Sequence, residues 1–174
     1  YPTGFLNFDF MNGTVMHVNT DVRNTKYYSV GIQDGCFVML IGRSSCGKTS
    51  WAVQASANII RKFDSSCIFH DDIEGGITES RKEILTGFYG EELKNRYIHR
   101  NTGVTAENFY ERIKMIHDIK LENRADYEYD TGCFDTNGDR IYKLAPTIYI
   151  LDSIALLMPS QYTDEEALSG SMSA

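Results

Sequence analysis

An eight-residue segment, Gly42–Thr49, limits the folds open to this chain more than any other part of it. The segment reads GRSSCGKT and follows the apolar run Cys36–Ile41, which predicts a buried strand. After it, apolar side chains recur at helical spacing over Lys48–Phe63. A strand, a glycine-bounded turn and a helix start place consecutive N–H groups around one point, where the helix N-terminus adds partial positive charge. The segment therefore predicts a loop that holds phosphate groups.

The chemistry of this loop predicts binding of ATP with Mg²⁺. Lys48 supplies a mobile cation for the β- and γ-phosphates, and we expect it to act in catalysis as well. The hydroxyl of Thr49 is placed to bind Mg²⁺. The predicted nucleotide-binding residues form one continuous stretch: Gly42, Arg43, Ser44, Ser45, Cys46, Gly47, Lys48, Thr49 and Ser50.

A second metal ligand is predicted at Asp152. It ends the apolar run Thr147–Leu151, and ligands of open α/β sheets bind at the carboxyl ends of the strands. The alternative is that Asp152 caps the next helix. We expect Thr49 and Asp152 to share the magnesium ion.

Hydrolysis also needs a group that orients the attacking water. The sequence Asp71-Asp72-Ile73-Glu74 follows a predicted strand, so it should reach the same edge of the sheet. We predict Glu74 as the catalytic carboxylate, with Asp72 as the second choice and a solvated acidic turn as the alternative. His70 precedes this segment, and we expect it to be structural rather than catalytic.

The order of the remaining elements predicts an α/β fold with a mainly parallel sheet flanked by helices. Strands are predicted at Cys67–His70, Tyr97–Arg100 and Thr147–Leu151. They alternate with helices at Thr78–Thr86 and Thr105–Glu122, each headed by a capping threonine. At 174 residues the chain is expected to form one domain.

Two segments are predicted to lie outside this alternation. Residues 1–35 should enter the core as loops and short strands. Residues 126–143 resemble an inserted β-hairpin, because Asn137-Gly138 is a strong signal for a two-residue turn. Asp135, Asn137 and Asp139 leave a calcium loop as an alternative, although Arg140 stands where such a loop needs glycine.

Composition narrows the possible partners. The net charge is −7, and residues 121–174 hold ten acidic and three basic side chains. No basic stripe indicates nucleic acid, so any DNA contact must come from local loops or from an assembly. The longest apolar run is far shorter than the ~20 residues of a membrane helix, and we expect no membrane association. The four cysteines lack metal-ligand spacing, which is typical of reduced cytosolic thiols.

The motifs together resemble the RecA family of recombinases and their phage relatives, over nearly the whole chain. The entry segment Thr3-Gly4, Phe8-Asp9 and Asn12-Gly13 is similar to that of RecA-like cores, and so is Gly35 before the first strand. The phosphate loop and Ile68–Thr78 resemble the family's phosphate loop and the segment with its catalytic glutamate, which maps onto Glu74. Leu151-Asp152-Ser153 with Ile154–Leu157 resembles the family's metal-binding strand end. Residues 19–29 and 126–143 look like insertions, and the spacing to Glu74 is one residue longer than in the family, which keeps Asp72 as the alternative.

The resemblance implies a three-layer, RecA-like P-loop core over residues 1–174, with further strands expected beyond Ala174. It implies an ATP-dependent DNA recombinase that hydrolyses Mg-ATP, binds single-stranded DNA through loops and assembles into a filament or ring. Residues 160–171, with Asp164-Glu165-Glu166, would form the first DNA-binding loop. A DnaB-type helicase and a non-hydrolysing RecA-like assembly partner are the alternatives, with a small-molecule kinase behind them. The expected location is the cytoplasm of a bacterial or phage-infected cell.

Overall fold

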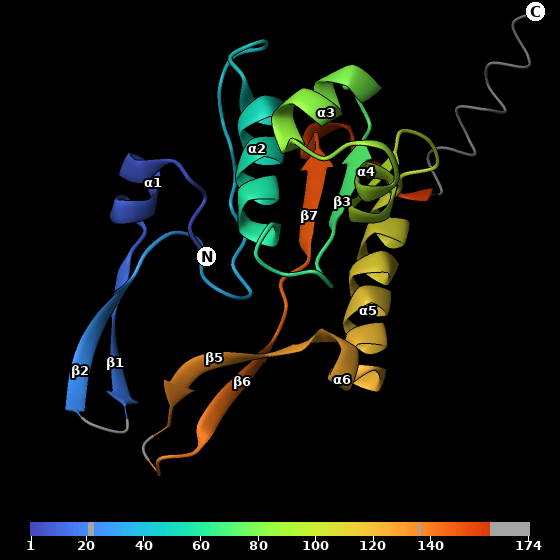
Figure 1. Ribbon diagram of the computed structural model, residues 1–174. Helices are drawn as coiled ribbons and strands as arrows, with labels where there is room; N and C mark the ends of the chain where they lie inside the picture. Colours follow the sequence, from blue (N-terminus) through green and yellow to red (C-terminus); the bar gives the residue numbers. More distant parts are fainter. Residues whose placement is uncertain (21–22, 136, 161–174) are drawn as a thin grey trace, which may run out of the picture.

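The parallel sheet is the centre of the fold. The computed structural model describes residues 1–20, 23–135 and 137–160. Within them, three strands lie in the order β4 (Tyr97–Arg100), β3 (Ile68–Asp72) and β7 (Ile148–Asp152), all parallel. Figure 1 shows β3 and β7 side by side at the middle of the molecule. The prediction of an α/β fold with a parallel sheet flanked by helices is confirmed.

Helices cover both faces of this sheet because alternate strand residues point to opposite sides. On one face, α2 (Lys48–Ile60), α3 (Glu79–Thr86) and α4 (Gly90–Arg96) lie over the even-numbered residues of β3 and β7. The core there is formed by Val53, Ala57, Ile60, Ile68, Ile77, Phe88, Leu93, Tyr97 and Ile150. On the other face, α5 (Ala106–Glu122) contacts odd-numbered residues, since the ring of Phe109 meets that of Tyr149 at 5.1 Å.

The helix ends follow the predicted caps. The Thr78 hydroxyl accepts a hydrogen bond from the Arg81 N–H, and Gly87 ends α3 with a left-handed φ of 69°. Thr105 caps α5 in the same way through the Asn108 N–H. Helix α2 ends three residues before the predicted limit, at Ile60. Helix α4 was not predicted, although its acidic first turn and basic last turn are typical of a helix.

The predicted strand at Cys36–Ile41 is wrong. The segment belongs to no sheet among the described residues. The side chains of Phe37, Met39 and Ile41 are 93%, 69% and 88% exposed. A strand needs a neighbour to supply its hydrogen bonds, and β7 pairs only with β3 in the described part of the chain. An apolar run predicts that a segment will be buried, but it does not specify a neighbouring strand to pair with that segment.

A second, antiparallel sheet joins the two segments that the sequence sets apart. Its strand order is β2 (Arg23–Ser29), β1 (Thr14–Thr20), β5 (Glu128–Phe134) and β6 (Arg140–Leu144). The hairpin predicted within 126–143 is therefore present. The carboxylate of Asp135 accepts hydrogen bonds from the N–H groups of Asn137 and Asp139, so it stabilises the turn. Strand β1 meets β5 through the pair Asn19–Phe134 (Figure 1).

The entry segment is a short helix, α1 (Leu6–Met11), anchored on α2. The rings of Phe5 and Phe8 pack on Trp51 at 5.3 and 4.8 Å. The carboxylate of Asp9 accepts hydrogen bonds from the Thr3 and Gly4 N–H groups, which fixes the chain before the helix. No helix among the described residues is long and apolar enough to cross a bilayer. The short helix α6 (Arg124–Tyr127) and one 3₁₀ turn (Ile154–Leu156) complete the fold.

Candidate functional site

The predicted phosphate loop is an open turn that leads into α2. Residues 42–47 are exposed, and Gly47 precedes the helix with a left-handed φ of 90°. A residue with a side chain would be strained there, so the glycine is needed for this turn. A Cβ at Gly42 would lie 2.8 Å from Cys46 Sγ, so a larger residue there would require the Cys46 side chain to move. The helix starts at Lys48, and its first N–H groups face the loop.

Lys48 folds back over the loop. Its Nζ donates hydrogen bonds to the carbonyl oxygens of Gly42 at 3.1 Å and Arg43 at 3.0 Å. These acceptors are neutral and solvent-exposed, and an ammonium group prefers a charged acceptor to a neutral one. Lys48 can therefore exchange them for phosphate oxygens without leaving an unpaired buried group.

Thr49 and Asp152 lie together although 103 residues separate them. The Thr49 hydroxyl donates a hydrogen bond to Oδ2 of Asp152. Thr49 is in the first turn of α2, and Asp152 is the last residue of β7, so the contact joins the helix start to the carboxyl edge of the sheet. A hydroxyl and a carboxylate in direct contact are an oxygen pair of the kind that Mg²⁺ binds.

The three carboxylates at the end of β3 and in the loop after it have different surroundings. Asp71 points to the α5 face, where Arg112 Nη1 donates to its Oδ2 at 2.7 Å and Tyr149 donates to the same oxygen. Asp72 points to the α2 face and is buried. Glu74 is exposed in the following loop. Strand alternation therefore gives these neighbouring carboxylates different environments.

Glu74 and Asp72, the two residues predicted to activate water, differ in whether their carboxylates are engaged in hydrogen bonds. Asp72 Oδ2 accepts the Ile77 N–H at 3.1 Å and lies 3.4 Å from His99 Nε2. Burial opposes the charge on Asp72, but the backbone N–H groups of Ile77 and Gly76 outweigh it, so the pKa of Asp72 is lowered. Glu74 is placed near the end of β7, because the N–H groups of Ile73 and Glu74 approach the Asp152 carbonyl at 2.6 and 3.4 Å. Glu74 is therefore exposed to contact with a ligand, whereas the Asp72 carboxylate is engaged by the loop that follows β3.

His70 lies beside this edge in a position that sequence reasoning did not assign to the site. It is 1% exposed, and its Nδ1 lies 2.5 Å from the Tyr97 hydroxyl. Burial lowers the pKa of His70 to about 4, so the imidazole is neutral at physiological pH. The signal that could have found it is the spacing His70-x-Asp72, which places both side chains on one face of a strand.

Two further hydrogen bonds tie α2 to the segments beside it. Arg81 on α3 donates from Nη2 to the Ser50 hydroxyl at 2.7 Å, which ties α3 to the first turn of α2. Asn58 donates from Nδ2 to the Thr3 carbonyl at 2.8 Å, which ties the entry segment to the same helix. Residues 161–171 of the predicted DNA-binding loop, with Asp164-Glu165-Glu166, lie outside the described residues.

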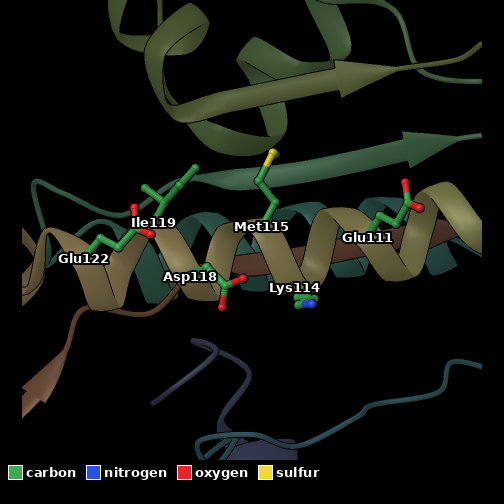
Figure 2. Close-up of a pocket in the computed structure, with 6 residues that line it drawn as sticks. All are labelled: Glu111, Lys114, Met115, Asp118, Ile119 and Glu122. Atoms are coloured by element: carbon green, nitrogen blue, oxygen red, sulfur yellow. The ribbon is translucent and has the colours of Figure 1, made fainter.

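A shallow hollow elsewhere on the molecule does not belong to this site. Figure 2 shows it on α5, on the face of the sheet opposite α2. All of its lining residues come from this one helix: Glu111, Lys114, Met115, Asp118, Ile119 and Glu122. A single helix face with both charge signs provides no convergent set of polar groups, so the hollow carries no functional assignment.

Comparison with known proteins gives no family for the chain. Neither a family model, nor a curated protein, nor a solved structure matches it. The features of the chain that point to a function are the loop, the contact between Thr49 and Asp152, and the polar side chains around them.

Proposed function

We propose that this chain binds and hydrolyses Mg-ATP as the core of a DNA recombinase. The observation that carries the nucleotide part is the contact between the Thr49 hydroxyl and the Asp152 carboxylate at the mouth of an exposed, glycine-bounded loop. Two such oxygens beside a helix N-terminus suit a metal ion that also contacts phosphate. The DNA part is supported by the sequence resemblance to RecA-family recombinases around Leu151–Leu157 and in the loop.

Each residue of the site has a role that follows from its position. Backbone N–H groups of residues 42–49 bind the phosphate oxygens, and Lys48 turns from the Gly42 and Arg43 carbonyls to the terminal phosphates. Thr49 and Asp152 hold Mg²⁺, which offsets the charge that develops on the transferred phosphoryl group. Glu74, exposed beside the end of β7, orients the attacking water and accepts its proton.

The nucleotide part is tested by binding of a fluorescent ATP analogue to the full chain. Lys48→Ala should weaken binding about 10- to 100-fold, because a hydrogen bond to a charged group is worth about 1.5–3 kcal/mol. Lys94→Ala is the matched control, since Lys94 is exposed and pairs with Glu91 within α4. Equal affinities for the two variants, or no binding by the unmodified chain, would refute this part of the proposal.

The hydrolytic part is tested by comparing two carboxamide variants. Glu74→Gln should keep nucleotide binding and lower turnover by about 100-fold or more, the contribution typical of a positioned general base. Asp72→Asn should act through stability, because Asp72 holds the loop through the Ile77 N–H. Turnover that is unchanged in Glu74→Gln but lost in a folded Asp72→Asn would transfer the role to Asp72.

The DNA part is tested by adding single-stranded oligonucleotides to the ATPase assay and by imaging the assemblies. A recombinase should hydrolyse ATP faster on single-stranded DNA and form filaments there. Closed hexameric rings that unwind a fork would favour the DnaB-type alternative instead. Normal nucleotide binding with no turnover, unchanged by Glu74→Gln, would favour the non-hydrolysing assembly partner.

A further inference from the structure

Three side chains converge at the carboxyl edge of the parallel sheet, beneath the phosphate loop. His70 and Asp72 lie two residues apart on β3, so they share the face covered by α2 and α3. Asp152 on β7 is the register partner of Asp72, which places it on the same face. Each residue offers one ligand atom, and these atoms all lie within 4.8 Å of one another.

A second observation points independently to a ligand at this cluster. His70 is 1% exposed, and its Nε2 has no hydrogen-bond partner among the described residues. The other ring nitrogen, Nδ1, is engaged by the Tyr97 hydroxyl at 2.5 Å. A buried polar atom without a partner is unfavourable, and such atoms are rare in folded proteins. Metal ligation would satisfy Nε2, because a hydrogen bond at one ring nitrogen commonly orients the other toward a metal.

The two aspartates have capacity for the same ligand. Asp152 uses Oδ2 to accept the Thr49 hydroxyl, and Asp72 uses Oδ2 to accept the Ile77 N–H. An ionised carboxylate offers about four lone-pair positions on two oxygens, so both groups retain acceptor sites. Two carboxylates at adjacent register positions also repel each other, and a cation between them would remove that repulsion.

We propose that His70, Asp72 and Asp152 form a binding site for a divalent transition metal such as Zn²⁺ or Co²⁺. The imidazole nitrogen favours these ions, whereas Mg²⁺ prefers oxygen ligands throughout. Three protein ligands leave a further coordination position open beside the phosphate loop. The site uses protein side chains only, so it binds metal without nucleotide and does not depend on the proposed ATPase function.

The test is a Co²⁺ titration of the full, metal-stripped chain without nucleotide, followed by visible absorption spectroscopy. We expect one equivalent of Co²⁺ to give the d–d bands of a four- or five-coordinate site. One equivalent of Zn²⁺ should displace it, and a thousandfold excess of Mg²⁺ should not. His70→Gln and Asp152→Asn should lose the bands. Tyr97→Phe should keep the site and weaken it about tenfold, as expected for a partner of a metal-bound histidine.

Controls separate this site from other metal-binding groups. His117→Gln, which removes an exposed histidine on α5, should leave the titration unchanged. Lys48→Ala should weaken nucleotide binding about 10- to 100-fold and leave Co²⁺ binding unchanged, which separates the metal proposal from the proposed function. Cys36 and Cys46 are exposed thiols, so their serine variants are titrated as well. Circular dichroism confirms that each variant is folded.

Three outcomes would overturn the proposal. The first is that the unmodified chain takes up no stoichiometric Co²⁺ or Zn²⁺. The second is that folded His70→Gln and Asp152→Asn bind Co²⁺ as tightly as the unmodified chain. The third is that the bands disappear on substitution of Cys36 or Cys46 and persist without His70.

Discussion

Removing Arg112 should destabilise the fold by about 3 kcal/mol, because it leaves a buried carboxylate without its cation. The side chains of Arg112 and Asp71 are 13% and 4% exposed, and their Nη1 and Oδ2 atoms lie 2.7 Å apart. Loss of one member of a buried ion pair typically costs about 3–5 kcal/mol. The lower end applies here, because the Tyr149 hydroxyl still donates to Asp71 Oδ2 in an Arg112→Met variant.

The assay is urea unfolding followed by circular dichroism, with the free energy of unfolding extrapolated to water. The double variant Asp71→Asn with Arg112→Met should recover most of the loss, since neither charge is then left unpaired. Lys94→Ala is the control, because the Lys94–Glu91 pair is 71% and 79% exposed and such pairs contribute less than about 1 kcal/mol. A loss below about 1 kcal/mol in Arg112→Met, or a double variant as unstable as the sum of its parts, would refute the assignment of Asp71 to a buried pair.

Two further predictions concern the entry segment and the α5 face. Asp9→Ala should lower the free energy of unfolding by about 1–3 kcal/mol, because the buried Asp9 carboxylate accepts a hydrogen bond from the Thr3 N–H. The control is Asn12→Ala, which changes an exposed side chain. Equal losses in the two variants would contradict this reasoning. Burial, together with the hydrogen bond to Asp71, raises the pKa of Tyr149 to about 12. The pKa of Tyr149 is higher in the folded chain than in the unfolded chain. The contribution of the protonated phenol to stability is therefore complete below about pH 10, the unfolded pKa, and is lost as the pH rises toward 12. The urea midpoint should therefore fall over that window in the unmodified chain and fall less in Tyr149→Phe, and parallel profiles would contradict the assignment.

The sequence predicted those features that depend on neighbours along the chain. Thr78 and Thr105 cap helices as expected, since a capping hydroxyl needs only an N–H group three residues away. The strand Tyr97–Arg100 has its predicted bounds. Asn137-Gly138 lies between β5 and β6 as expected, but the paired strand ends are Phe134 and Arg140, so the connection is longer than the predicted two-residue turn. The positions of Lys48 and Asp152 at the start of a helix and the end of a strand could also be predicted, because the motif and the apolar run each specify a local element.

Features that depend on distant segments could not be predicted in the same way. The run Cys36–Ile41 was expected to be a strand, yet no described strand lies beside it. The pairing of β1 with β5 joins residues more than 100 positions apart, and neither strand sequence specifies its partner. His70 was expected to be structural, and only the tertiary structure places it within 4.8 Å of ligand atoms of Asp72 and Asp152.

By itself the sequence determined the glycine-bounded loop, the capped helices and the polar residues that end each strand, because backbone conformation and alternation are local properties. Only the tertiary structure decided which of these residues meet. It brought Thr49 to Asp152, brought Asp71 to Arg112, and buried His70 close to the carboxylates of Asp72 and Asp152. Those contacts depend on strand order and register, which are fixed by packing and hydrogen bonding between segments far apart in the chain.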